Sequence, residues 1–364
     1  MGQGISVRQM GAACLGITFV MLTTCVAQQN RKPRPPGLTP QNSGTKNGLI
    51  AVSAANSRVV WACGSKGTFT VTTDGGNTWK AGVVPGAETL QFRDVQAVSD
   101  QIAYLLSIGD HPTDFRIYKT TDGGAIWTMQ LQNQRPKAFY DCFAFWTPTR
   151  GIVHSDSVDG AFPDLLTIDG KSWHDISAKL PHALEGEGSF ASSGTCVATQ
   201  SEKNGWIATG NSPTARVLAT RDGGHTWNAY NTPLESAPGA GAFTVAFRDA
   251  QNGILGGGSL DPKHSDNAAA AISHDGGKTW TMTNPPPITG AIYGLSYVST
   301  GKHPDNLART VVITANQGGA AWTPDEGATW FKLPDVSGYW GVAFADTQSG
   351  WLVGTDGRIL RINF

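Results

Sequence analysis

The sequence predicts an all-β protein whose strands form a single seven-bladed β-propeller. The first observation is a phrase of the form Asp-Gly-Gly-x-Thr-Trp that returns about every fifty residues, a period typical of propellers and solenoids. The second is that each copy lies between two β-prone runs, as expected of a hairpin turn. The third is composition: 45 Gly and 12 Trp with 15% charged residues suit many short strands joined by tight turns.

The repeated phrase has a structural explanation. Its six copies begin at Asp74, Asp122, Asp169, Asp222, Asp275 and Asp325. Glycine accepts a positive φ without a Cβ clash, so the glycine pair predicts a tight turn. The Asp carboxylate can accept hydrogen bonds from backbone N–H groups later in the turn, and the Trp ring can be buried between neighbouring sheets. We therefore expect these aspartates to be structural and not catalytic.

The last unit shows the design of a blade most clearly. Residues 339–346, 349–354 and 358–364 predict three strands, with no further copy of the phrase after them. Counting in this way gives six four-stranded units and a seventh with three strands. Because a closed ring leaves no open sheet edge, we expect a segment before Gly48 to supply the missing outer strand. Rings of six or eight blades are the alternatives.

The N-terminal region predicts export. In residues 1–27, Arg8 precedes an apolar run of small residues that is too short to span a membrane and fits a secretory signal cleaved after Ala27. The protein would then be periplasmic or extracellular. Residues 22–25 also resemble a lipobox, which predicts instead an outer-membrane lipoprotein with a lipid anchor on Cys25. Residues 28–47 predict a linker rich in Pro and Lys that could supply the closing strand, and residues 48–364 predict the propeller.

Three cysteines fall in the predicted propeller, namely Cys63, Cys142 and Cys196. Alignment of the repeats places Cys142 and Cys196 at the same position of successive inner strands, so their side chains should point the same way round the ring. Sheets that pack about 10 Å apart hold such positions too far apart for a disulfide. We expect buried thiols that act as small apolar residues.

Several classes of function lack a signal. The formal net charge of −1 offers no basic surface for nucleic acid. No two histidines have a short metal-ligand spacing such as His-x-His, so no metal site is predicted. The sequence has no Cys-x-x-Cys pair, and the glycines at 256–258 lack the βαβ context of a nucleotide-binding fold. No cofactor is therefore expected.

The repeats also carry a family resemblance. The turn phrases, together with the Gly-Trp-x-Val-Gly-x-x-Gly-x-Ile text of residues 350–359, resemble the photosystem II assembly and stability factor family and the Asp-box (BNR) repeats of sialidase-type propellers. Residues 186–195 and 215–217, with Asp261 and residues 267–269, are similar to secreted bacterial Asp-box propellers often named oxidoreductase or glycosyl hydrolase. The resemblance spans about residues 48–364 and implies the propeller fold. Because nothing in the sequence indicates a photosystem, it does not imply that function.

The candidate binding region is the end of the ring opposite the Asp-boxes. Strands in a blade alternate in direction, so the turns between second and third strands share that end with the links between blades. These connections are long in blades 2 to 5, and long loops on a rigid scaffold usually carry binding sites. The candidate ligand-binding residues in them are Asp156, Glu187, Arg216, Asp261 and His264.

The leading interpretation is an exported, non-enzymatic propeller that binds a protein or a glycan through this end. Asp156, Glu187 and Arg216 come from neighbouring connections, so we expect them to converge, with the arginine between two ionised carboxylates. Tyr293 and Trp340 could contribute near the channel or pack between blades.

The alternative is a glycoside-cleaving hydrolase. Asp156 and Glu187 are the candidate catalytic carboxylates, and Arg216 would orient the sugar. The sialidase class is not supported, because the nearest match to its Arg-Ile-Pro segment, at residues 115–118, lacks the proline.

Overall fold

The computed structural model describes residues 1–4, 33–261, 263, 268–299 and 307–364. The chain divides into two units, residues 1–34 and 35–364, and all the described strands belong to the second. Most of the predicted export signal, including Cys25, lies outside the described residues, as does His264. Within the described part of the chain, no helix has the length and apolar character needed to cross a membrane.

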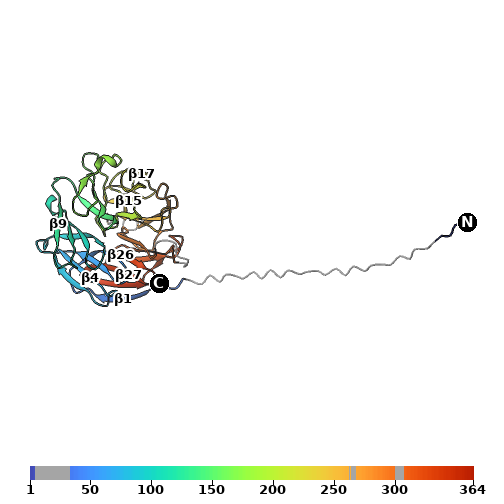
Figure 1. Cartoon of the computed structure of the whole chain (residues 1–364), viewed down its shortest axis with the longest axis horizontal. Helices are drawn as coiled ribbons and strands as arrows, with labels where there is room; N and C mark the ends of the chain where they lie inside the picture. Colours follow the sequence, from blue (N-terminus) through green and yellow to red (C-terminus); the bar gives the residue numbers. More distant parts are fainter. Residues whose placement is uncertain (5–32, 262, 264–267, 300–306) are drawn as a thin grey trace. The chain divides into compact units, whose positions relative to one another are not determined.

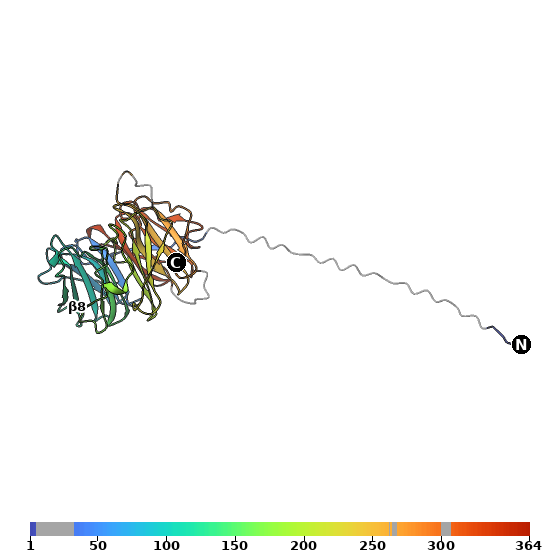
Figure 2. The same cartoon turned by 90° about the horizontal axis from the view of Figure 1, so that it is seen from above.

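The second unit contains seven four-stranded antiparallel sheets, which confirms the predicted seven-bladed propeller. In Figure 1 the colours pass around this unit from blue through green and yellow to red, so the blades follow one another in chain order. Figure 2 shows the same strands turned by 90°. Each blade begins with its innermost strand, and the next strands follow outward in sequence order.

The strands of blades 1 to 4 have the following bounds. Blades 1 and 2 comprise β2 (Leu49–Ala54), β3 (Val60–Gly64), β4 (Thr68–Thr72), β5 (Lys80–Val83), β6 (Gln91–Ala97), β7 (Ala103–Ile108), β8 (Arg116–Thr120) and β9 (Thr128–Gln132). Blades 3 and 4 comprise β10 (Tyr140–Thr147), β11 (Arg150–Ser155), β12 (Leu165–Thr167), β13 (His174–Asp175), β14 (Val197–Gln200), β15 (Asn204–Thr209), β16 (Arg216–Thr220) and β17 (Asn228–Asn231).

The remaining strands complete the ring. Blades 5 and 6 comprise β18 (Ala240–Phe247), β19 (Gly253–Ser259), β20 (Ala269–Ser273), β21 (Thr281–Met282), β22 (Gly294–Tyr297), β23 (Val311–Thr314), β24 (Ala320–Thr323) and β25 (Phe331–Lys332). Blade 7 comprises β26 (Tyr339–Asp346), β27 (Ser349–Gly354), β28 (Arg358–Asn363) and β1 (Gly37–Asn42).

The seventh blade takes its outer strand from the N-terminal side of the chain. β1 pairs antiparallel with β28, from Gly37 opposite Asn363 to Asn42 opposite Arg358. The missing strand therefore comes from residues before Gly48, where the sequence analysis expected it. Blades 1 and 7 also share an apolar cluster that contains Leu49 and Trp351, both fully buried.

The core lies between the blades, and large aromatic side chains form much of it. Trp206 in blade 4 stacks on Phe247 in blade 5, with ring centroids 3.6 Å apart. The Trp206 Nε1–H donates a hydrogen bond to the carbonyl of Gly276, in the Asp-box of blade 5. Because each large aromatic buries about 150–250 Å², such contacts hold neighbouring sheets in a fixed relationship.

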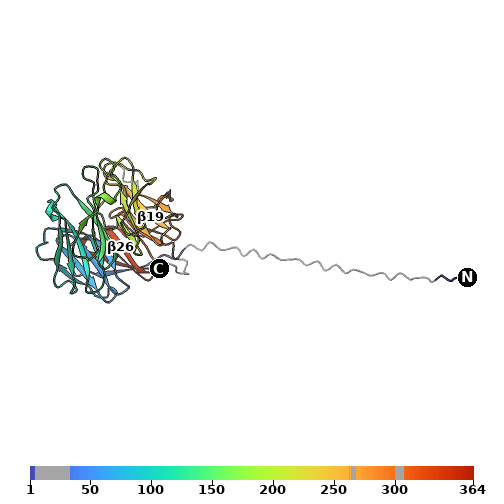
Figure 3. The ribbon, with the colours of Figure 1, turned by 45° about the horizontal axis from the view of Figure 1, so that its top comes forward.

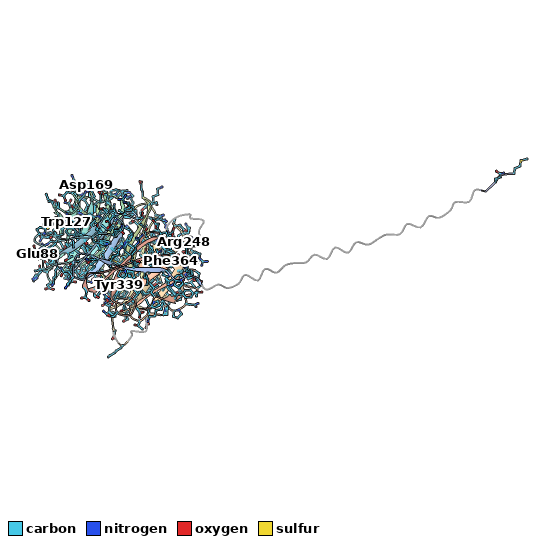
Figure 4. The ribbon with its side chains drawn as sticks, turned by 90° about the horizontal axis from the view of Figure 1, so that it is seen from below. Glu88, Trp127, Asp169, Arg248, Tyr339 and Phe364 are labelled. Atoms are coloured by element: carbon cyan, nitrogen blue, oxygen red, sulfur yellow. A yellow bond between two sulfur atoms is a disulfide. The ribbon has the colours of Figure 1, made fainter. Side chains whose placement is uncertain are left out.

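The Asp-boxes join the third and fourth strands of blades 1 to 6, and Figure 4 labels Asp169 and Trp127 from two of them. In blade 4, Asp222 accepts hydrogen bonds from the Thr226 N–H at 2.9 Å and from the Thr226 and Thr220 hydroxyls at 2.7 and 2.8 Å. Burial opposes ionisation of Asp222, but these bonds outweigh it and lower its pKa to about 2. Gly223 and Gly224 have φ of +72° and +85°, as the glycine pair predicts.

The cysteines differ from the prediction. Cys142 in β10 and Cys196, next to β14, form a disulfide with their Cα atoms 5.9 Å apart. The spacing of about 10 Å holds for the faces of packed sheets, whereas the inner strands β10 and β14 approach one another closely beside the channel. The prediction of free thiols was therefore wrong for this pair. Cys63 is a buried free cysteine.

Candidate functional site

A cavity of about 350 Å³ opens at the end of the ring opposite the Asp-boxes. Its wall includes Asp156, Asn211 and Leu260, which follow the second strands of blades 3, 4 and 5. Residues 189–192 and Tyr293, from links between blades, complete this part of the wall. Since these connections share one end of the ring, the cavity lies where the sequence analysis placed the binding region.

Four of the seven inner strands each turn one position toward this cavity. In β6, β10, β18 and β26 the pairing with the next strand is interrupted by an irregularity of the β-bulge kind. The residues at the four irregularities are Arg93, Asp141, Phe243 and Trp340, and all four line the cavity. Tyr293, immediately before β22, lines it from blade 6. We call these five residues the mouth ring. Figure 3 labels β26, which lies near the centre of the unit.

The bulges explain why these side chains are available. A β-bulge leaves one residue without a partner on the next strand and re-aims its side chain. In β10, Asp141 falls between Tyr140 and Cys142, which pair with Ser155 and His154. In β26, Trp340 falls between Tyr339 and Gly341 in the same way. In blades 2, 3, 5 and 7 the repeated fold therefore presents one bulge side chain to the cavity, and the residue differs from blade to blade.

Aromatic rings form one side of the cavity. Phe190 and Phe243 stack with centroids 3.6 Å apart, and Tyr293 and Trp340 stack at 5.0 Å. The Phe243 and Tyr293 rings lie 5.9 Å apart and join the two stacks. These contacts place Tyr293 and Trp340 in the cavity wall and also give them the packing role that the sequence analysis considered.

A pair of carboxyl groups forms another side. Asp141, only 1% exposed, is hydrogen-bonded through its carboxyl group to Asp156. Burial raises the pKa of both residues, and the neighbouring Asp156 charge raises the pKa of Asp141 further. Two carboxylates in contact cannot both ionise readily, and we infer from this contact that the pair shares one proton. Asp156 also accepts a hydrogen bond from the Ser189 N–H at 2.9 Å.

A buried His-Asp contact lies next to this pair. His154 Nδ1 is 2.8 Å from Asp164 Oδ2, and both side chains are fully buried. The interaction with His154 lowers the pKa of Asp156. The charge of Asp164 raises the pKa of Asp141. His154 therefore belongs to the surroundings of the carboxyl pair and does not line the cavity itself.

Arg93 supplies the positive charge of the mouth ring. Its guanidinium lies over the Trp340 ring, 5.7 Å from the centroid, and donates hydrogen bonds to the Ala191 carbonyl and to Gln91 Oε1. Burial lowers its pKa. Among the described residues no carboxylate oxygen lies within 4.0 Å of it, so its charge has no ion-pair partner there.

Glu187 and Arg216 lie close together, as expected. However, Arg216 pairs with Glu187 and does not lie between Glu187 and Asp156. Arg216 donates from Nε to Glu187 Oε1 at 2.9 Å and from a terminal nitrogen to Glu187 Oε2. The Thr209 hydroxyl and the Leu184 N–H donate two more hydrogen bonds to the same carboxylate. The Glu187 side chain is 0% exposed. Its oxygens are thus fully engaged within the fold.

Asp156 neighbours Glu187 along the backbone, where the Ser157 N–H donates to the Glu187 carbonyl at 3.0 Å. The two carboxylates nevertheless enter different contacts, Asp156 with Asp141 and Glu187 with Arg216. Asp261 lines a separate cavity of about 430 Å³ beside blade 5. Of the five predicted ligand-binding residues, four lie in the described part of the chain, and of these Asp156 alone lines the cavity at the channel mouth.

Sequence reasoning did not identify Arg93, Asp141, Phe190 or Phe243. A signal was present for Asp141, which is the one charged residue of the largely apolar inner strand β10. Across the described ranges, no group of three or more His, Cys, Asp and Glu side chains is arranged to hold a metal ion.

Comparisons with known proteins agree with this architecture. The family model described as BNR/Asp-box repeat matches residues 271–282, which include the Asp-box of blade 5. A sialidase from Bacteroides fragilis (strain YCH46) is 25% identical over 334 residues, which cover 82% of this chain and 56% of that protein. The chain therefore spans little more than half the length of this relative.

Solved propellers are similar in fold. YCF48 bound to a D1 peptide matches with a TM-score of 0.61 and 15% identity, over 92% of this chain and 96% of that chain. YCF48 from Cyanidioschyzon merolae gives a TM-score of 0.62 and 18% identity over 90% and 98%. The WD40 propeller domain of Doa1 gives 0.56 and 13% over 90% and 97%. The protein is therefore a seven-bladed β-propeller that contains a match to the BNR/Asp-box repeat and shares its fold with YCF48.

Proposed function

We propose that this protein is a non-enzymatic binding propeller that holds a segment of a protein ligand in the cavity at its channel mouth. The observation that carries this proposal is the mouth ring, in which five of the seven blades each turn one side chain into the cavity, four of them at an irregularity in the inner strand. A rigid ring that presents different side chains at equivalent positions is suited to recognise an irregular ligand such as a peptide. The stacked aromatics supply apolar contact area at little cost in conformational entropy.

A fold relative supports a peptide as the ligand. One of the similar structures is YCF48 bound to a D1 peptide, so a propeller of this architecture can hold a peptide. At 15% identity this likeness extends to the fold alone. For the present chain, the support comes from the apolar walls and the polar groups of its own cavity.

The second candidate is a glycoside-cleaving hydrolase, which the similarity to a sialidase favours. Its chemistry needs two carboxyl groups about 5 to 9.5 Å apart on either side of the bond to be cleaved. Here Asp141 and Asp156 are hydrogen-bonded to one another, and Glu187 is taken up by Arg216. Arg93 is the only arginine among the described residues that line the cavity. This arrangement suits binding better than cleavage.

Export is part of the proposal. The disulfide between Cys142 and Cys196 fits an oxidising compartment, where structural disulfides persist. A periplasmic or extracellular location agrees with the signal predicted in residues 1–27. Mass spectrometry of the protein recovered from its native cells would distinguish a chain that begins after Ala27 from one that begins with a lipid-modified Cys25.

The test of binding is selection from a random peptide library displayed on phage, with the full chain as bait and a synthetic copy of the selected peptide for affinity measurement. Ala191→Trp fills the cavity from its wall and should weaken binding at least tenfold. Ala125→Trp, at an exposed position of an Asp-box, is the matched control and should leave affinity unchanged. Equal affinities for the two variants would refute the proposed site. Release of the fluorophore from umbelliferyl glycosides, abolished by Asp156→Asn, would favour the hydrolase.

A further inference from the structure

We infer that the channel-mouth cavity recognises a cationic nitrogen group of its ligand, an ammonium or a guanidinium, through the carboxyl pair Asp141 and Asp156. The inference rests on the proposed binding function and specifies the chemistry that the ligand must bring to the cavity. It follows from three observations: an unsatisfied oxygen, the balance of charge, and the aromatic wall.

The first observation is that the carboxyl pair is incompletely satisfied. Asp141 is almost fully buried, and beyond the contacts of its carboxyl group with Asp156 and the Ala191 N–H, its Oδ2 has no hydrogen-bond partner among the described residues. A further donor at this oxygen would complete its hydrogen bonding. Among the described residues, no lysine or arginine nitrogen lies within 4.0 Å of Asp141 or Asp156. The pair therefore lacks a cation and lies at the wall of a cavity that can admit one.

The second observation is the charge of the cavity. Arg93 contributes one positive charge, and the carboxyl pair with its shared proton contributes one negative charge. The adjacent His154 and Asp164 form a contact of their own. When a ligand cation enters, the shared proton leaves to solvent and both carboxylates become ionised. The cavity then holds two negative and two positive charges, so the ligand cation replaces the proton without a change in net charge.

The third observation is that the aromatic wall already holds one cation. The Arg93 guanidinium lies over one face of Trp340, and Tyr293 stacks on the same residue. Aromatic faces attract ammonium and guanidinium groups, more strongly where water is excluded. Phe190 and Phe243 lie in the same cavity as Asp156 and Asp141. A cationic side chain with an apolar stem would therefore meet aromatic carbon along its length and carboxylate at its tip.

The probes for the test are Nα-acetyl-lysine N-methylamide, its arginine counterpart and the neutral Nε-acetylated lysine derivative. Calorimetric titration of the full chain should give an affinity for at least one cation that is tenfold or more above that for the neutral probe. Comparison of the lysine and arginine derivatives distinguishes ammonium from guanidinium. Binding of all three probes with equal affinity would overturn the inference.

Variants of Asp141 and Asp156 test whether these two carboxyl groups bind the cation. Asp141→Asn and Asp156→Asn should each weaken cation binding at least tenfold, whereas Asp159→Asn should not. Asp159 is a matched control because it lies in the same blade with an 80% exposed side chain paired to Lys137. If Asp141→Asn does not fold, titration of the unmodified protein in two buffers of different ionisation enthalpy still tests the mechanism, since binding must release protons. Binding without proton release at every pH at which the protein is folded would contradict it.

The outcomes separate this inference from the proposed function. Peptides selected from the library could bind at the cavity, which Ala191→Trp would show by weakening their affinity. The same peptides could keep their affinity when each Lys and Arg is replaced by norleucine and the N-terminus is acetylated. In that case the binding function would stand and the inference would fall. Failure of all peptides and all cations to bind would overturn both.

Discussion

Arg216, in β16 of blade 4, forms a bidentate ion pair with Glu187, in the connection between blades 3 and 4; the Glu187 side chain is fully buried and accepts two further hydrogen bonds. The sequence suggested a ligand-binding role for both residues. A residue that contacts mainly a ligand contributes little to the fold, so Glu187→Gln would change the free energy of unfolding by no more than about 1 kcal/mol. The contacts indicate a different result. Loss of one partner from a buried pair leaves the other charge uncompensated, which costs about 3–5 kcal/mol.

Glu187→Gln should therefore shift the urea unfolding midpoint to a clearly lower concentration. Glu88→Gln, at an exposed position labelled in Figure 4, is the control and should leave the midpoint unchanged. A stable Glu187→Gln variant with impaired peptide binding would instead support the original expectation.

The closing strand gives a second prediction. Deletion of residues 37–42 removes β1 and exposes the edge of β28, so the melting temperature should fall by several degrees. Deletion of residues 28–36 stops before β1 and should leave the melting temperature nearly unchanged. Equal melting temperatures for the two deletions would show that pairing of β1 with β28 does not contribute to closure of the ring.

The Asp-boxes predict how stability depends on pH. The pKa of Asp222 is lowered to about 2, so its ionised form stabilises the fold above the unfolded pKa and this contribution is lost as pH falls through about 2. Asp222→Asn should cost about 1 kcal/mol near pH 6, as for lost caps elsewhere. The difference from the unmodified protein should shrink between about pH 4 and pH 2 in urea unfolding at each pH. A difference that is constant over this range would contradict the assigned role of the carboxylate.

The disulfide gives a fourth prediction. Replacement of both Cys142 and Cys196 by Ser should lower the free energy of unfolding by about 2–4 kcal/mol, since the cross-link closes a loop of 54 residues. Cys63→Ala keeps the disulfide and is the comparison. Thiol titration of the unfolded, unreduced protein without residues 1–27 should find one thiol, from Cys63. Three thiols would show that the disulfide does not form.

The architecture was predictable because its signals are local. The glycine pair found in four of the six Asp-boxes has positive φ in every copy, and the period of the boxes counts the blades. Because successive strands of a blade run in opposite directions, this pattern also predicted the end of the ring at which the cavity lies. Asp156 was identified because it follows a strand at that end.

The chemistry of the cavity was less predictable because it depends on tertiary contacts. Asp141 reaches the cavity through a bulge in β10, and the alternation of side chains in a strand does not show where a bulge falls. Glu187 lies in a loop with the expected composition, but the side chain turns to Arg216 in the next blade. The disulfide was missed because an average sheet spacing does not describe inner strands beside the channel.

Photo-crosslinking tests most directly the claim that the protein binds its ligand at the channel mouth. Benzoyl-phenylalanine would replace Leu260, 51% exposed at the cavity wall, or Ile126, 68% exposed in an Asp-box at the other end of the ring. The selected peptide should crosslink at position 260 and not at position 126. Crosslinking at 126 without crosslinking at 260 would place the binding site on the Asp-box face and contradict the account.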